Sequence, residues 1–81
     1  MKIHKIAVDD IYVPAPLRKT LKSEATDAMA EEILENGFKI PIQVRNDGKR
    51  YILIEGIHRL EAAKALGEIE IESLIVQARK H

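Results

Sequence analysis

The sequence contains no cysteine and no long apolar run. Without cysteine the chain has no disulfide framework and no thiol chemistry. No stretch approaches about 18 consecutive apolar residues, so we expect no membrane-spanning helix. The first residues, MKIHK, also lack the apolar stretch of a signal peptide. We therefore expect a cytoplasmic protein with no membrane partner.

The chain also lacks net charge, because its 13 basic residues balance its 13 acidic ones. A protein that binds nucleic acid by itself is usually clearly basic. The charges are nevertheless segregated. Residues 23–36 carry five acidic residues and no basic one, whereas residues 37–60 carry five basic and two acidic residues. This distribution favours a local anion site over a surface that follows a long phosphate backbone.

At 81 residues, with 46% hydrophobic and 32% charged residues, the chain has the size and composition of one globular domain, residues 1–81. Its hydrophobic pattern predicts the order β-α-β-β-α-β. That order predicts an α+β fold, in which the helices cover at least one face of a small mixed sheet. The expected strands cover residues 3–8, 41–45, 50–55 and 69–76, and the expected helices cover residues 24–35 and 58–66.

Local signals set these boundaries. Ser23 is a suitable N-cap for the first helix, and the pair Asp47-Gly48 predicts a tight hairpin. Four consecutive apolar residues, Tyr51–Ile54, predict a strand that is buried on both faces and central in the sheet. The prolines of residues 12–18 predict an extended connection without a helix.

The turn that follows this apolar strand is the candidate binding site. Gly56 permits a tight turn and a close backbone approach, and the N-terminus of the next helix favours an anion. His58 and Arg59 add donors there, since a guanidinium can hold a phosphate through two parallel hydrogen bonds. Glu55 stands at the strand end, where its carboxylate could hold an Mg²⁺ ion between itself and the phosphates.

From spacing alone, a purely structural interpretation is preferred. In it, Arg59 forms an ion pair with the first helix and His58 caps its own helix. The three histidines, His4, His58 and His81, lie too far apart in the sequence to predict a metal site. Around the expected hairpin, Arg45, Lys49 and Arg50 either extend a phosphate site, contact DNA, or are simply solvated.

The segment Gly56–Gly67, GIHRLEAAKALG, resembles the Gly-x-x-Arg-x-x-Ala-Ala-x-x-x-Gly signature of the ParB N-terminal domain. Its Gly-x-His-Arg start looks like that of sulfiredoxin and of the ParB-like free serine kinases. Upstream, Asn36-Gly37 and Pro41–Val44 match the family's helix-Gly-x-x-x-Pro-Ile-x-Val segment. Val13–Leu17 is similar to the Arg-Pro-x-Pro stretch of sulfiredoxin. The resemblance spans about residues 6–76 and implies the ParB/sulfiredoxin fold.

The resemblance also implies that a nucleoside triphosphate binds at this turn, with Gly56, His58 and Arg59 matching the phosphate-contacting residues. In ParB proteins the nucleotide is CTP, which switches a clamp on DNA. In sulfiredoxin and the serine kinases it is ATP or ADP, and phosphate is transferred. ParB-like chains often keep an arginine after the Pro-rich segment, which implies that Arg18 covers the nucleotide from the opposite side.

The sequence departs from these relatives at Ile57. Sulfiredoxin has its catalytic cysteine at this place, so reduction of a sulfinic acid through that thiol is excluded. Partition ParB proteins usually carry a glutamate there as a metal ligand, and isoleucine cannot ligate a metal. The acidic residues Glu31, Glu32 and Glu35 would also repel a polyphosphate if they faced the site.

Two functional hypotheses follow, and the first is preferred. The chain is a nucleotide-binding or regulatory module, linked to DNA partition or transcription, that reports ATP or CTP to a protein partner or a DNA-associated complex. Alternatively, it is a small ATP-dependent phosphotransferase or nucleotidase that uses Glu55, His58 and Arg59. A third interpretation, a scaffold that has lost its ligand and serves as an interaction surface, also stays open. The small core makes a homodimer plausible.

Overall fold

The computed structural model describes residues 2–37 and 40–77. Across these residues, five strands form one mixed sheet in the order β1-β5-β3-β4-β2. The chain forms, in order, β1 (Ile3–Ala7), the 3₁₀ helix η1 (Val8–Asp10), β2 (Ile11–Tyr12), α1 (Ala15–Arg18), α2 (Ser23–Asn36), β3 (Ile42–Asn46), β4 (Tyr51–Glu55), α3 (Ile57–Ala65) and β5 (Glu70–Ile75). The predicted order of longer elements is confirmed, with η1, β2 and α1 added.

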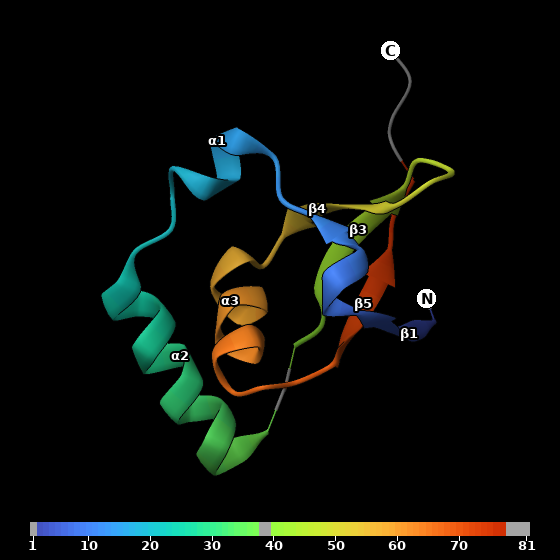
Figure 1. The fold of residues 1–81 in the computed structure, drawn as a ribbon. Coiled ribbons are helices and arrows are strands. Elements are labelled where there is room, and N and C mark those ends of the chain that lie inside the picture. Colours follow the sequence, from blue (N-terminus) through green and yellow to red (C-terminus); the bar gives the residue numbers. More distant parts are fainter. Residues whose placement is uncertain (1, 38–39, 78–81) are drawn as a thin grey trace.

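One face of the sheet packs on α3, and α2 lies on the far side of α3 from the sheet (Figure 1). Leu60 and Ala63 of α3 are fully buried against Val44 and Leu53 of the sheet. Ala62, also fully buried, and Ile33 of α2 lie outside that cluster. The result is a layered arrangement of sheet, α3 and α2.

The predicted extended connection over residues 12–18 is wrong, because Ala15–Arg18 form the short helix α1. Pro14 has an extended backbone at the N-cap, and Pro16 lies in the first turn. The first backbone N–H groups of a helix have no intrahelical acceptor, so a proline at this place loses no hydrogen bond. A proline therefore starts a helix as readily as it ends one.

The prediction for Tyr51–Ile54 is only partly confirmed. Ile52 and Leu53 are buried, but Ile54 is 41% exposed. In the sheet, β4 lies between β3 and the two-residue edge strand β2, while β3 is the middle strand. Ile11 and Tyr12 pair in parallel with Tyr51 and Ile52, a pairing too short to be visible as sequence alternation.

The helix α2 begins at Ser23, and Lys22 is its N-cap residue, so the prediction of Ser23 as N-cap is wrong by one position. The side chain of Lys22 makes no capping hydrogen bond. Its C-terminus follows the prediction, because Gly37 has a φ of 75° and its N–H donates to the carbonyl of Ile33 over 2.7 Å. The hairpin between β3 and β4 is also confirmed, with Gly48 at a φ of 95°.

Candidate functional site

The helices α2 and α3 begin close together. Nε2 of His58, in the first turn of α3, accepts a hydrogen bond of 3.2 Å from the backbone N–H of Lys22, the N-cap residue of α2. Both helices run in the same general direction, and their N-termini lie at the end nearest α1 (Figure 1). Two helix N-termini with their partial positive charges therefore share one region of the molecule.

No side chain caps α3 either, and its N-cap residue is Gly56. The first internal bond of this helix is donated by Leu60 to the carbonyl of Gly56 over 3.0 Å. The N–H groups of the residues before Leu60 therefore have no intrahelical acceptor. Such groups, together with the helix dipole, form a natural seat for an anion.

Two adjoining hollows lie beside this region, and we call them together the α3 cleft. The smaller has a volume of about 360 Å³ and the larger about 720 Å³, and they share Leu21, Glu61 and Lys64. Clefts of about 300–1,000 Å³ are typical of small-molecule sites. The remaining lining residues are Val13, Arg18 and Ile57 in the smaller hollow, and Thr26, Asp27 and Ala65 in the larger.

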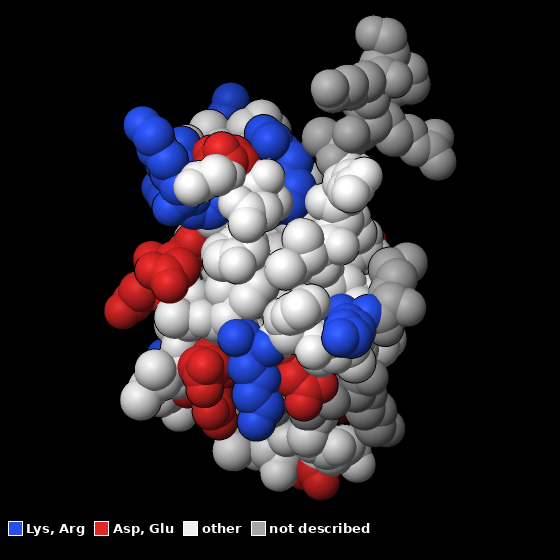
Figure 2. Space-filling view, turned by 90° about the vertical axis from the view of Figure 1, so that its right-hand side faces the viewer, with Lys and Arg blue, Asp and Glu red and all other residues white. Residues whose placement is uncertain are grey.

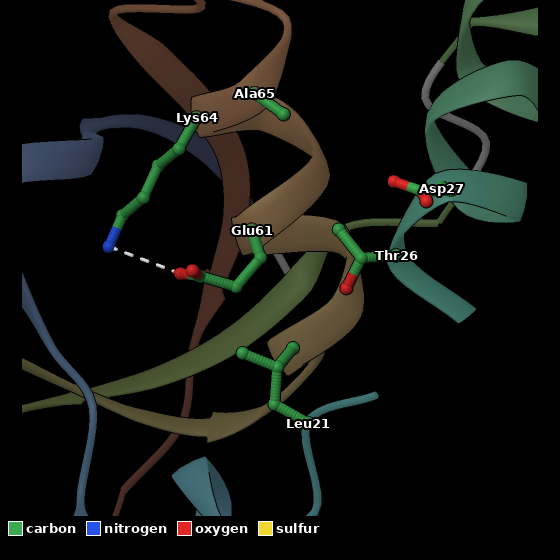
Figure 3. Close-up of a pocket in the computed structure, with 6 residues that line it drawn as sticks. All are labelled: Leu21, Thr26, Asp27, Glu61, Lys64 and Ala65. Atoms are coloured by element: carbon green, nitrogen blue, oxygen red, sulfur yellow. Dashed lines mark ion pairs between the residues drawn. The ribbon is translucent and has the colours of Figure 1, made fainter. Parts of the chain in front are cut away.

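The α3 cleft has a mixed electrostatic character. Figure 3 shows Glu61 and Lys64 on α3 and Thr26 and Asp27 on the neighbouring α2, with the charged ends of Glu61 and Lys64 directed away from Asp27. Lys64 Nζ lies 3.2 Å from a carboxylate oxygen of Glu61. Arg18 and Lys64 favour an anion in the cleft, whereas Asp27 and Glu61 oppose it. An anionic ligand would gain if Lys64 exchanged its carboxylate partner for that ligand.

The structure brings the predicted site residues to one end of α3. Arg18 lines the cleft, His58 and Arg59 are half-buried in the first turn of α3, and Glu55 is exposed at the end of β4. Gly56 has a φ of 107°, and a Cβ atom there would lie 2.7 Å from Cγ2 of Ile42. Packing against Ile42 and the left-handed backbone therefore both favour glycine at this position.

The structural alternative for Arg59 and His58 is not what the described residues show. Within residues 2–37 and 40–77, the ion pairs are Arg50 with Asp47 and Lys64 with Glu61, so Arg59 has no carboxylate partner there. His58 bonds to the start of α2 instead of capping its own helix. His58 therefore acts as an acceptor at the junction of the two helices, and Arg59 makes no ion pair among the described residues.

The sequence analysis predicted that the acidic residues of α2 would repel a polyphosphate only if they faced the site. Glu31, Glu32 and Glu35 are exposed in the C-terminal half of α2, away from the N-terminus of that helix. It is Asp27, nearer the start of α2, that lines the cleft. The condition for the predicted repulsion, that Glu31, Glu32 and Glu35 face the site, is therefore not met.

The roles of Glu61 and Lys64 were missed by the sequence analysis. Together with Ile57 they recur at the spacing i, i+4, i+7, which places them on one side of α3. That spacing was available in the sequence. The spacing alone does not predict a cleft, because the opposite wall is formed by Arg18 of α1 and by Leu21, which are distant in the sequence.

The described residues contain no group of three or more side chains able to hold a metal ion, and His81 lies outside the described ranges. Magnesium is commonly held by one or two carboxylates together with the phosphates of a nucleotide. Glu55, the carboxylate predicted for this role, is exposed at the end of β4 and lines neither hollow of the α3 cleft. Among the helices that the structure describes, none is both long enough and apolar enough to cross a membrane.

The fold is that of the ParB/sulfiredoxin class. Sulfiredoxin from Arabidopsis thaliana superposes with a TM-score of 0.85 at 23% sequence identity, over 96% of this chain and 88% of that chain. The chromosome-partitioning protein ParB from Caulobacter crescentus, C-terminally truncated and complexed with CTP-γ-S, gives 0.82 at 20% identity, over 99% of this chain and 47% of that chain. A free serine kinase variant in complex with ADP gives 0.83 at 21% identity, over 95% of this chain and 32% of that chain.

The whole chain, residues 1–81, matches the model of the ParB N-terminal domain, and the protein belongs to that family. A curated relative, the probable chromosome-partitioning protein ParB of Campylobacter jejuni, is 43% identical over 72 residues. The match covers 86% of this chain and 26% of the relative, so the chain spans about a quarter of that protein's length. The predicted family and the α+β fold are therefore confirmed.

Proposed function

We propose that this chain is a nucleotide-binding regulatory module, and that the triphosphate of CTP or ATP binds where α2 and α3 begin. The observation that carries the proposal is the meeting of the N-termini of α2 and α3. The N-cap residues Lys22 and Gly56 make no side-chain capping bond of their own, and the hydrogen bond from the Lys22 backbone N–H to Nε2 of His58 joins the two ends. Two helix dipoles directed at one place favour a multiply charged anion more than either would alone.

The cations around this junction support the same ligand. Arg59 stands in the first turn of α3 without an ion-pair partner among the described residues, and Arg18 approaches from α1. A guanidinium group can bind two phosphate oxygens at once through two parallel, charge-assisted hydrogen bonds. Val13, Leu21 and Ile57 give the cleft an apolar wall against which a base or a ribose would pack.

Mg²⁺ belongs to this proposal as a companion of the nucleotide. Bound between phosphate oxygens, it would neutralise part of their charge. Glu55 is the protein residue that would coordinate the Mg²⁺, since it is exposed and directly precedes Gly56. Ile57 offers no ligand atom, so the affinity for the metal would depend mainly on the phosphates.

A binding role is preferred to phosphoryl transfer because the strongest candidate base is already engaged. Nε2 of His58 accepts a hydrogen bond from the Lys22 backbone, and it would have to leave this bond before it accepted a proton. The ParB relative is named as a chromosome-partitioning protein. We therefore propose that nucleotide binding here is reported to a protein or DNA-associated partner in the cytoplasm.

The test is a calorimetric titration of the chain with CTP, ATP, ADP and GTP, with and without Mg²⁺, and in parallel a thermal-shift measurement. At a ligand concentration of 100 times Kd, binding should stabilise the folded chain by about 2.7 kcal/mol. Arg59→Ala and Arg18→Ala should each weaken binding, whereas Arg45→Ala, on the opposite face of the sheet, should not. If no nucleotide binds, or if all three variants bind alike, the proposal is wrong.

An assay of phosphate release separates the module from the phosphotransferase. A module should bind its nucleotide without turnover above the level of an Arg59→Ala control. Turnover that depends on Arg59 would instead establish an enzyme.

A further inference from the structure

One hydrogen bond joins the start of α2 to the first turn of α3. The backbone N–H of Lys22 donates to Nε2 of His58 over 3.2 Å. Among the backbone and side-chain groups that the structure describes, no other hydrogen bond or ion pair connects residues 19–36 with α3. The state of the His58 imidazole therefore decides whether the two helix N-termini are linked in this way.

This hydrogen bond requires a neutral imidazole. A ring nitrogen accepts a hydrogen bond through its lone pair, and in a protonated histidine both ring nitrogens are donors. Histidine is also the side chain that ordinarily changes its charge between pH 5 and 8. The bond from Lys22 is therefore available to the neutral form of His58 and is lost when Nε2 takes up a proton.

A phosphate group at the same place has the opposite requirement. The phosphate oxygens of a nucleotide are negatively charged acceptors, so they gain from donors and above all from charged donors. A neutral Nε2 offers them only a lone pair. Protonation of His58 replaces one internal donor–acceptor pair by two donors, the Lys22 N–H and the imidazolium. A nucleotide bound between the two helix N-termini therefore favours the protonated imidazole.

The free junction, in contrast, favours the neutral imidazole. His58 lies in the first turn of α3 and is bonded to the N-cap residue of α2, so the positive ends of both helix dipoles are close to it. The charged side chains of the elements that meet here nearly balance: Arg18 and Lys19 at α1, Lys22, Glu24 and Asp27 at α2, Glu55 at the end of β4, and Arg59, Glu61 and Lys64 on α3. The helix dipoles therefore oppose a further positive charge until an anion arrives.

We infer that nucleotide binding at this site is coupled to the uptake of one proton by His58, whose Nε2 then leaves the Lys22 N–H and donates to a phosphate oxygen. The inference rests on the proposed function and adds a dependence on pH to it. The proton comes from water or buffer and returns there when the nucleotide dissociates. By linkage, uptake of one proton weakens binding by up to about tenfold for every unit by which the pH rises.

A second group of cations offers the nucleotide another place to bind. The β3–β4 hairpin carries Arg45, Lys49 and Arg50 and has no histidine. Figure 2, which shows the side of the molecule opposite α2, has Lys and Arg side chains near its upper end. A nucleotide held by the hairpin would not change the charge of His58. Proton uptake that depends on His58 therefore also distinguishes the helix junction from the hairpin.

Calorimetric titration of the 81-residue chain with CTP and with ATP, in the presence of Mg²⁺, tests the coupling. Repeating it near neutral pH in buffers of different ionisation enthalpy measures the protons taken up for each nucleotide bound. In His58→Gln the amide can accept from Lys22 or donate to a phosphate, but it cannot take up a proton. We expect the parent chain to take up more protons than this variant, and its Kd to rise more steeply with pH.

His4→Gln is the matched control, because His4 is exposed on β1, and this variant should behave like the parent chain. Nucleotide bound to the parent and to His58→Gln with equal proton uptake would overturn the inference and leave the proposed function intact. If no nucleotide binds to the parent chain, both are wrong. Imidazole ¹⁵N spectra of the parent chain decide the case in which His58→Gln binds too weakly to measure: at saturating nucleotide, a protonated His58 supports the coupling and a neutral one contradicts it.

Discussion

At the scale of single residues, Gly56 is fixed by its backbone conformation and by packing, and it is also the residue at which we propose the ligand binds. Its backbone has a φ of 107°, where residues other than glycine are strained. Any Cβ atom would also press on the buried side chain of Ile42. The fold therefore needs this glycine even without a nucleotide, while the absence of a side chain leaves the α3 N-terminus open.

Replacing Gly56 by alanine should destabilise the chain by about 2–4 kcal/mol, the sum of a left-handed backbone and an overpacked contact. Gly67→Ala is the matched control, because Gly67 has a φ of 77° but a Cβ atom there would meet open space, with nothing within 4 Å. This control should lose only about 1–2 kcal/mol. Urea denaturation measures both, and equal losses would refute the role assigned to Ile42.

Glu61 is the residue whose charge most directly opposes an anion in the α3 cleft. Glu61→Gln removes that charge and releases Lys64 from its ion pair. Nucleotide binding should become about fivefold tighter, since two unit charges at close range in water interact by about 1 kcal/mol. Calorimetric titration measures the change. Glu35→Gln, which removes an exposed carboxylate at the other end of α2, should leave Kd as it was.

At the scale of the elements, the Asp47 carboxylate stabilises the β3–β4 hairpin, together with the Asn46 side chain, whose Oδ1 accepts from the N–H of Gly48 over 2.7 Å. The backbone N–H groups of Arg50 and Lys49 donate to Oδ1 of Asp47 over 2.9 and 3.1 Å. These hydrogen bonds hold the pKa of Asp47 below its usual value of 3.8, and the nearby charges of Arg50 and Arg45 act in the same direction. The ionised form is therefore the one that the folded hairpin favours.

Because the pKa of Asp47 is lower in the folded chain than in the unfolded one, its contribution is present above pH 3.8 and is lost as the pH falls through the folded value. Asp47→Asn keeps an acceptor but cannot titrate. The variant should show a smaller loss of unfolding free energy between neutral pH and pH 2 than the parent chain. Urea titrations at several pH values measure this. Identical pH profiles would contradict the assignment.

The elements also show where sequence signals were sufficient. The apolar stripe and Asn36-Gly37 predicted α2 within one residue at each end, and Asp47-Gly48 predicted the hairpin. The short elements were missed because η1, β2 and α1 have two to four residues each. Such elements are stabilised by contacts with distant parts of the chain, as β2 is by β4, and those contacts leave no local periodicity.

At the scale of the whole molecule, the fold class was predictable because the spacing of Gly56, Arg59 and Ala62-Ala63 carries the family resemblance. The candidate site was predictable only as a turn. Its second half, the start of α2 and the cleft with Glu61 and Lys64, depends on how α1 and α2 lie beside α3 (Figures 1 and 3). The positions of α1 and α2 relative to α3 are decided by packing between elements, and a single sequence contains no local pattern that predicts this packing.

The parallel course of α2 and α3 gives the molecule one electropositive end without net charge. The sequence total of zero therefore says little about ligands, because fixed backbone dipoles add to the side-chain charges. The acidic half of α2 lies at the opposite end of that helix. This separation keeps the exposed glutamates of α2 away from the anion site that we propose.

The most direct test of the account is an amide ¹H–¹⁵N NMR titration of the chain with CTP and with ATP, in the presence of Mg²⁺. We predict that the largest shifts fall on the residues at the two helix N-termini, Lys22 and Gly56 to Arg59, and on Arg18 and Leu21 beside them. Amides of the β3–β4 hairpin, including Gly48, should stay in place. Shifts confined to the hairpin or to the face of the sheet away from α3, or no shifts at saturating nucleotide, would contradict the central claim.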